Sequence, residues 1–151
     1  MLCNTIMHSP PHRLYADNTI QEAIDLLLEH HMFSVPVVDR NEIFLGEIST
    51  RDLTGLLLPM SLTMEGGLRN TGFVRESLGE LKERLAEISG HHLEPYIDTD
   101  VSVVHPDSPL IDALMLLFDK DIRVPVVERN GRKLLGSISF MTLLRTLEEL
   151  A

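Results

Sequence analysis

The feature that most constrains the fold of this 151-residue chain is an internal repeat. The segments Ser34–Asp39 (SVPVVD) and Gly46–Asp52 (GEISTRD) return in the second half as Arg123–Glu128 (RVPVVE) and Gly136–Thr142 (GSISFMT). The spacing between the two segments is one residue longer in the second copy, which places an additional residue in the intervening turn. Because both segments recur in the same order, the repeated unit is a whole supersecondary structure.

Length and charge limit what such a repeat protein does. The chain is about one domain long, so two half-size repeats must share a single core. It carries 13 Lys and Arg against 23 Asp and Glu, a formal net charge of -10. This balance argues against sequence-independent binding to a nucleic-acid backbone, which requires clustered basic residues. A small polyanion would need a local positive pocket within an acidic surface.

The single cysteine, Cys3, rules out an internal disulfide and fits a reducing compartment. No apolar run approaches the roughly 18 residues that span a bilayer, and the first 15 residues lack the apolar centre of a signal peptide. We therefore expect a cytoplasmic protein that does not contact the membrane.

Hydrophobic periodicity predicts the same order of elements in both halves: strand, helix, strand, strand, helix. The motif Thr19–Glu22 has the form of a capping box and starts the first helix. In the first half we expect an irregular arm over 1–16 that ends in an extended piece at 13–16, a helix over 20–32, strands over 34–38 and 43–49, and a helix over 50–58. In the second half we expect an extended segment at 102–104, a helix over 110–118, strands over 123–128 and 133–139, and a helix over 140–150.

Residues 59–93 have no counterpart in the other half. The first part, which contains Gly66, Gly67 and Gly72, is expected to be a loop. The second part, from about Val74 to Ser89, predicts an amphipathic helix with a stripe of four apolar side chains, Leu78, Leu81, Leu85 and Ile88. This stripe must cover either the apolar surface of the protein itself or that of a partner.

The repeated pattern, a helix followed by a Pro-Val-Val-acid strand, a turn and a Gly-x-Ile-Ser strand that enters a helix, resembles a tandem pair of CBS domains, known as a Bateman module. The resemblance implies an α+β fold of two β-α-β-β-α repeats related by a pseudo-twofold axis, with a helical insert between them. The implied division is 1–58 for the first repeat, 59–93 for the insert and 94–151 for the second repeat. The family also implies a homodimer and clefts between repeats that bind AMP, ADP, ATP or S-adenosylmethionine.

The resemblance further implies which residues contact the ligand. Ser49 and Asp52 match the hydroxyl residue and the acid that contact ribose in the family, and Thr50 lies between them. An ionised carboxylate suits this role because it accepts two hydrogen bonds from a vicinal diol. The family positions of Arg51 and Arg123 imply phosphate contacts.

The resemblance assigns adenine packing to Val35 and Pro36, at the apolar edge of the first strand of the hairpin. In the second copy Ser139 is retained, but Thr142 replaces the acid. We therefore expect one competent site, organised by Asp52, and an altered or empty second site. The sequence leaves open which of the two clefts Arg123 faces.

Each of these assignments has a purely structural alternative. Ser49 and Asp52 also form an ordinary helix start, in which the acid only caps the helix. Val35 and Pro36 fit a buried strand equally well, and the two arginines fit partners among the many acids. Asp52→Glu separates the first pair of alternatives, because a helix cap tolerates the longer acid and a diol ligand does not.

Seven histidines raise the question of a metal site, in particular His8 and His12. Pro10 and Pro11 prevent the helix that would place these two on one face, so their spacing carries little weight and no metal is expected. Cys3 is expected near a mobile terminus, without a catalytic partner. No Gly-x-Ser-x-Gly, His-Glu-x-x-His or paired-cysteine motif occurs, so the sequence predicts a non-enzymatic protein without a catalytic cofactor.

Three functions remain open from the sequence. The first is a regulatory sensor of an adenosine-containing ligand, which signals to an unidentified regulated protein. The second is a constitutive dimerisation or scaffolding module with degenerate sites, which Thr142 favours and Asp52 opposes. The third, a metal- or redox-responsive regulator that uses the histidines and Cys3, has the least support.

Overall fold

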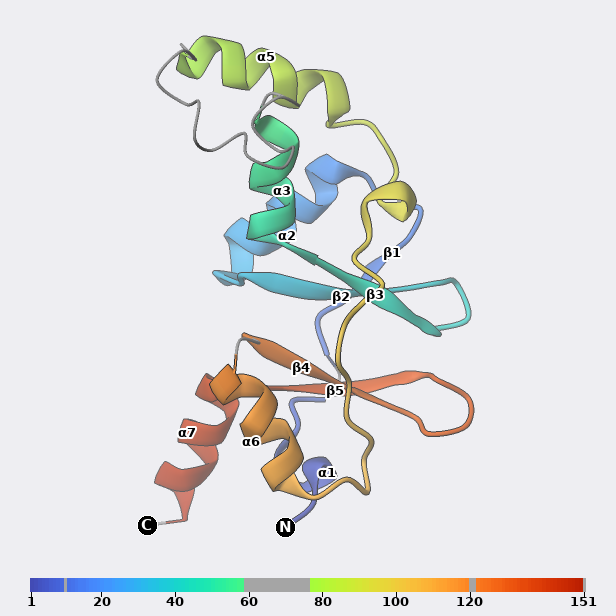
Figure 1. Ribbon diagram of the computed structural model, residues 1–151, viewed down its shortest axis with the longest axis vertical. Coiled ribbons are helices and arrows are strands. Elements are labelled where there is room, and N and C mark those ends of the chain that lie inside the picture. The colour runs from blue at the N-terminus through green and yellow to red at the C-terminus, as the bar shows by residue number, and fades with distance from the viewer. Residues whose placement is uncertain (10, 59–76, 120–121, 151) are drawn as a thin grey trace.

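The computed structural model describes residues 1–9, 11–58, 77–119 and 122–150. Two small sheets face each other at the centre of the molecule, and the helices lie on their outer sides (Figure 1). The elements in chain order are α1 (Cys3–Ile6), β1 (Leu14–Tyr15), α2 (Ile20–His30), β2 (Ser34–Val38), β3 (Phe44–Ser49), α3 (Thr50–Leu57), α5 (Leu78–Ile88), the 3-10 helix η2 (Glu94–Tyr96), α6 (Leu110–Asp119), β4 (Arg123–Val127), β5 (Leu134–Ser139) and α7 (Phe140–Glu149). The predicted mixed fold of two β-α-β-β-α repeats is confirmed.

Each repeat is built on an antiparallel hairpin. In the first repeat β2 pairs with β3, and β1 adds a parallel strand along β2. In the second repeat β4 pairs with β5, and the counterpart of β1 is reduced to one parallel bridge between Val104 and Val126. The helix after each hairpin starts at a serine cap, Ser49 or Ser139, whose hydroxyl accepts a hydrogen bond from the backbone three residues on.

The first helix of the first repeat confirms a local prediction. Thr19 and Glu22 form the capping box at the start of α2, with the Thr19 hydroxyl bound to the Glu22 N–H at 3.2 Å. The last helical residue is His30, and the C-cap His31 adopts the left-handed conformation with φ 53°. The helix therefore ends two residues before the predicted boundary at Met32.

The two hairpins contact each other near their turns. An isolated antiparallel bridge joins Ile43 to Lys133, with the Phe44 N–H bound to the Arg132 carbonyl at 2.9 Å. Both repeats also contribute to one apolar cluster, which consists of Val38, Phe44, Val127 and Leu134. The repeats therefore share a core at their junction, as the length of the chain requires.

The two repeats exchange the segments that precede them. His8 forms an antiparallel bridge with Ser137 of the second repeat, and Asp98 forms the equivalent bridge with Glu47 of the first. The buried residues Cys3 and Ile6 of α1 lie in the core of the second repeat. The prediction of a mobile end at Cys3 is wrong, because Cys3–Ile6 folds into the short helix α1 and completes the apolar core of the other repeat. The predicted extended piece at 13–16 is confirmed as β1. The division of the chain at residues 58 and 93 stays a prediction, and the packing of α1 crosses it.

The exchange of segments explains why each hairpin has a glycine at the equivalent position, Gly46 in β3 and Gly136 in β5. A Cβ at Gly136 would lie 2.9 Å from the His8 carbonyl oxygen, and one at Gly46 would overlap the Asp98 carbonyl oxygen. Neither glycine has a positive φ. The reason for glycine at both positions is therefore the close approach of the exchanged segment and not a special backbone conformation.

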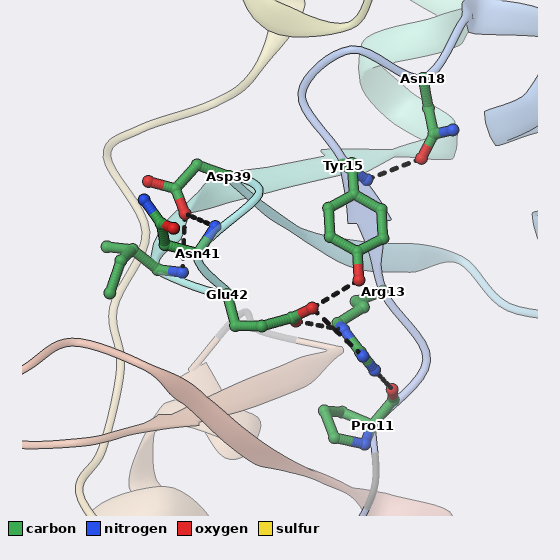
Figure 2. A network of polar contacts seen from close by, with 8 residues as sticks. Pro11, Arg13, Tyr15, Asn18, Asp39, Asn41 and Glu42 are labelled. Atoms are coloured by element: carbon green, nitrogen blue, oxygen red, sulfur yellow. Dashed lines mark hydrogen bonds and ion pairs between the residues drawn. The ribbon is translucent and has the colours of Figure 1, made fainter.

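A polar network fixes the entry of the chain into β1 (Figure 2). Glu42, in the turn between β2 and β3, accepts hydrogen bonds from the Arg13 guanidinium and from the Tyr15 hydroxyl. These bonds lower the pKa of the Glu42 carboxyl, with the Tyr15 hydroxyl as the largest cause. The Asn18 side chain accepts a further bond from the Tyr15 N–H at 2.7 Å. The network holds β1 against the hairpin turn of the first repeat.

The insert helix α5 covers part of the protein's own surface. It starts at Leu78 with Ser77 as N-cap, and the expected start at Val74 and the expected glycine loop lie outside the described residues. Leu85 and Ile88 line an apolar groove with α2 and α3, which has a volume of about 260 Å³. Leu78 remains 85% exposed, whereas Leu81, Leu85 and Ile88 are half-buried, so all of the predicted stripe except its first residue is partly covered. Among the described helices, none has the length and apolar character to cross a membrane.

Candidate functional site

The junction of the repeats holds two adjacent clefts, and each is lined by residues from both halves of the chain. We call first cleft the cavity of about 260 Å³ lined by Phe33, Ser34, Glu47, Ser49, Thr50, Arg51, Asp52, Asp98, Asp100, Val101 and Ile122. We call second cleft the cavity of about 490 Å³ lined by His8, His12, His30, His31, Met32, Phe33, Ile122, Arg123, Ser139, Phe140, Met141, Thr142 and Arg145. Phe33 and Ile122 line both cavities and therefore separate them.

Asp52 and Ser49 lie together at the start of α3, in the wall of the first cleft. One carboxylate oxygen, Oδ2, accepts hydrogen bonds from the Ser49 backbone N–H at 3.0 Å and from the Ser49 hydroxyl at 2.9 Å. The Ser49 hydroxyl in turn accepts a bond from the Asp52 N–H at 3.1 Å. This reciprocal capping box holds the half-buried carboxylate in one orientation, and both bonds from Ser49 end on the same oxygen.

The first cleft is acidic. Among the described residues of its lining, the acidic ones are Glu47, Asp52, Asp98 and Asp100, and the only Lys or Arg is Arg51. Asp98 comes from the exchanged segment that pairs with β3. A cavity with this balance repels a highly charged anion and favours neutral or cationic groups that donate hydrogen bonds.

Of the residues predicted to contact a ligand, Ser49, Thr50, Arg51 and Asp52 line the first cleft. Val35 and Pro36 are fully buried in β2 and lie outside the lining of both clefts. Their places at the cavity wall are taken by the preceding residues of the chain, Phe33 and Ser34. In this structure Val35 and Pro36 therefore lie in a buried strand, which is the structural alternative to adenine packing.

Arg123 lines the second cleft, away from Asp52. Its guanidinium donates a hydrogen bond to the Ser137 hydroxyl at 3.0 Å. Burial lowers the pKa of Arg123, and the nearby carboxylate of Glu47 opposes this effect. The question that the sequence leaves open is thereby answered, since Arg123 and Asp52 face different cavities.

The start of α7 repeats the start of α3 without the acid. The Ser139 hydroxyl accepts a hydrogen bond from the Thr142 N–H at 3.2 Å and lies 3.0 Å from the Thr142 hydroxyl. The first turn of α7 contains no acidic residue. The positive end of this helix is therefore not offset by a carboxylate of its own.

Sequence reasoning missed a cluster of three histidines in the second cleft. The rings of His8 and His12 are stacked with centroids 5.7 Å apart, and His30 lies 4.2 Å from His12. The exchanged arm brings His8 and His12 past the end of α2, so no helix is needed to place them together. In the described ranges no group of three or more His, Cys, Asp or Glu has an arrangement that could hold a metal ion.

The structure defines a class of protein, the tandem-repeat module. Its two repeats have paired hairpins, exchange their preceding segments and leave two clefts at their pseudo-twofold junction. The sequence agrees with this class. The family model described as CBS domain matches residues 3–59 and again residues 93–149, and the chain belongs to this family as a tandem CBS pair.

The chain is similar to two curated proteins, one of them from a plant. The chain is 28% identical over 134 residues to the chloroplastic CBS domain-containing protein CBSX1 of Arabidopsis thaliana. That alignment covers 85% of this chain and 55% of CBSX1, and the chain spans about half the length of the curated relatives it matches.

Two solved structures show the fold at lower identity. CBSX2 of Arabidopsis thaliana in complex with AMP has a TM-score of 0.71 and 23% identity, with 99% of this chain and 97% of that chain covered. The CBS pair of MJ0100, in complex with 5-methylthioadenosine and S-adenosyl-L-methionine, has a TM-score of 0.65 and 19% identity, with 100% and 98% covered.

Proposed function

We propose that this CBS pair is a regulatory sensor that binds an adenosine-containing ligand in the first cleft. The observation that carries the proposal is the Asp52 carboxylate, held by Ser49 in the cavity wall at the start of α3. Oδ1 is not used by the bonds from Ser49, and an ionised carboxylate accepts bonds from both hydroxyls of a ribose. The adenosyl ligands of CBSX2 and MJ0100 support this ligand class.

The charge of the first cleft predicts which adenosyl ligands bind there with higher affinity. Four carboxylates around one arginine disfavour the phosphates of ADP and ATP. S-adenosylmethionine carries a sulfonium cation beside its ribose, and AMP carries the shortest phosphate group. We therefore expect S-adenosylmethionine or AMP to bind in the first cleft more tightly than ATP.

The module has no catalytic role in this proposal and works by population shift. A ligand that contacts both repeats favours one arrangement of the repeats by the difference in its affinity for the two arrangements. The helix α5, which rests on α2 and α3 and leaves Leu78 exposed, is the proposed moving or partner-binding part. Saturating ligand is then expected to change hydrogen exchange in α5, and unchanged exchange would contradict this part of the proposal.

Isothermal titration with AMP, ADP, ATP and S-adenosylmethionine tests the ligand assignment. We expect binding of one ligand at about one site per chain with micromolar affinity. Asp52→Ala should abolish this binding, and Asp52→Glu should weaken it strongly while α3 remains capped. Binding that is equal in wild type and Asp52→Ala would show that the first cleft is not the site.

A homodimer in the cytoplasm is part of the proposal. The face of α6 and α7 presents six exposed apolar side chains, Ile111, Met115, Phe118, Leu144, Leu147 and Leu150. Phe118 is 91% exposed, and an apolar patch of this kind marks an interface. Sedimentation of wild type and Phe118→Asp tests this, since the substitution should shift the protein toward monomer.

A scaffolding function is the second candidate, and the replacement of the acid by Thr142 favours it. In that case the dimer forms through α6 and α7 and neither cleft binds an adenosyl ligand. The titration separates the two functions, because a scaffold gives no heat with any of the four ligands and still dimerises.

A further inference from the structure

The second cleft differs from the rest of this acidic protein in its charge. Its lining includes Arg123, Arg145 and four histidines, and among the described residues of the lining there is no Asp or Glu. The chain as a whole has a net charge of -10. This cavity is therefore the local positive pocket that a polyanion would need in order to bind this protein.

His12 is the central ring of a histidine cluster in the second cleft. His12 lies between His8 on the same arm and His30 at the end of α2, with ring centroids 5.7 and 4.2 Å away. Burial lowers the pKa of His12, and His30, His8 and Arg123 lower it further, while Glu29 opposes them. A proton on His12 is therefore unfavourable unless an anion offsets the positive charge around it.

Two elements, β4 and α7, direct positive charge or hydrogen-bond donors into the same space. Arg123 enters from β4, and Arg145 enters from α7. The start of α7 adds the positive end of a ten-residue helix, where Thr142 stands in place of an acid. At about 490 Å³ the cavity is large enough for a chain of phosphate groups.

We propose that the second cleft is a proton-linked binding site for a polyphosphate group. The anion lies between Arg123, Arg145 and the three imidazoles, and its negative charge favours the protonated form of His12, the central ring of the cluster. This inference does not depend on the proposed function, because it concerns the other cleft and a ligand group that contains no ribose.

The direction of the pH dependence follows from the geometry. In the free protein burial and the neighbouring cations lower the pKa of His12, and a bound anion opposes this by favouring the protonated ring. Binding therefore takes up a proton, and affinity rises as the pH falls. The gain is fully present once the pH is below the free-state pKa of His12 and is lost as the pH rises through its pKa in the complex.

Isothermal titration with inorganic triphosphate at about pH 6 and about pH 8 tests the inference. We expect affinity to be at least about tenfold higher at the lower pH, since each linked proton changes the binding constant by up to tenfold per pH unit. Repeating the titration in buffers of different ionisation enthalpy measures proton uptake directly. Sulfate, whose charge is constant over this range, should show the same direction and excludes protonation of the probe as the cause.

Two variants test the assignment of the site without removing the buried arginine. His12→Gln should reduce the pH dependence, and Arg145→Gln should weaken binding at both pH values. His92→Gln, at an exposed histidine outside the cleft, is the matched control and should behave as wild type. Thermal unfolding of each variant verifies that it is folded.

The inference is wrong if triphosphate binds no more tightly at the lower pH, or if it binds His12→Gln and Arg145→Gln as it binds wild type. Adenosine, which has no phosphate, tests the first cleft separately. Failure of both adenosine and S-adenosylmethionine to bind, and of AMP to bind in a manner sensitive to Asp52→Ala, together with proton-linked binding of triphosphate, would refute the proposed function and support the second-cleft site.

Discussion

The two clefts occupy equivalent places in the two repeats, yet their charges are opposite. Ser34 at the start of β2 occupies the same position in its repeat as Arg123 at the start of β4. In the second strand of each hairpin, Glu47 of β3 likewise corresponds to Ser137 of β5. The exchanged segment contributes Asp98 to the first cleft and His8 to the second. The duplication has therefore kept the residues that build the hairpins and changed the residues that face the cavities.

Folding and ligand choice therefore depend on different residue positions within each repeat. Gly46 and Gly136 admit the exchanged segment in both repeats, and Ser49 and Ser139 cap the following helices in both. None of these four positions sets the charge of a cleft. One backbone arrangement can thus present an acidic and a basic cavity a short distance apart.

The largest expected effect concerns the shared glycines. Gly46→Ala should lower the free energy of unfolding by about 3 kcal/mol, because the new methyl group overlaps the Asp98 carbonyl oxygen and the exchanged segment must move. Gly136→Ala should cost about 2 kcal/mol, since its closest contact is the flexible end of Met7 at 2.8 Å. Chemical denaturation measures both.

The control for this pair is Gly55→Ala in α3, where a Cβ would meet no atom within 4 Å. That substitution should stabilise the protein by about 0.5–1 kcal/mol through helix propensity. Equal effects of Ala at Gly46 and Gly55 would contradict the close-approach explanation.

The second prediction restores the missing acid. Thr142→Asp should complete a capping box with Ser139 and raise the free energy of unfolding by about 0.5–1 kcal/mol. The same carboxylate should weaken triphosphate binding by about fivefold, since it places a negative charge beside the bound anion. Thr142→Asn caps the helix without the charge, so it should keep the affinity. Titration calorimetry and thermal unfolding separate the two effects.

The third prediction concerns the Arg13–Glu42–Tyr15 network of Figure 2, which belongs to the first repeat. Glu42→Gln should lower the free energy of unfolding by about 1 kcal/mol at neutral pH, the scale of charged hydrogen bonds at a half-exposed site. The folded-state pKa of Glu42 is lowered, so its contribution is present above the unfolded pKa of about 4.3 and is lost as the pH falls through the folded value.

Denaturation across this acidic range measures that dependence. The difference between wild type and Glu42→Gln should shrink below about pH 4. Glu87→Gln, at an exposed position of α5, is the control and should show no comparable difference. A difference that stays constant with pH would mean that the carboxylate charge is not the cause.

The smallest effect is expected where the repeats agree. Asp17 pairs with Arg40 at 2.7 Å, and the equivalent Asp107 pairs with Arg129 at 2.8 Å. The arginine lowers the pKa of each acid, but all four side chains are well exposed. Asp17→Asn and Asp107→Asn should therefore leave the unfolding midpoint nearly unchanged in both repeats, and a large change in either would show a role beyond a surface ion pair.

The fold was predictable from the sequence because its determinants are local. The capping motif at Thr19, the serine caps after the hairpins and the Pro-Val-Val strands each act within a few residues. The helix α1 was not predictable, because its stability comes from packing Cys3 and Ile6 against a repeat more than a hundred residues away. Periodicity over four residues does not reveal such a contact.

The candidate site was predictable in part for the same reason. Ser49 and Asp52 belong to one contiguous motif, and they line a cleft as expected. The second cleft is assembled from the arm, α2, β4 and α7, and no local pattern joins these segments. The proline pair that excludes a helix at His8 and His12 is correct as a local argument, yet the extended arm brings the same two rings together.

The exchanged segments also decide how this protein can be divided. A fragment ending at residue 58 would carry α1 without the core that buries it, and its own core would lack Leu93 and its neighbours Tyr96 and Ile97. A fragment beginning at residue 77 would have the reverse deficiency. Neither half is a self-sufficient folding unit, and the two produced separately should gain structure only when mixed. The topology therefore predicts fragment complementation. By the same exchange, a single repeat would complete its core by swapping its arm with an identical copy, which is domain swapping.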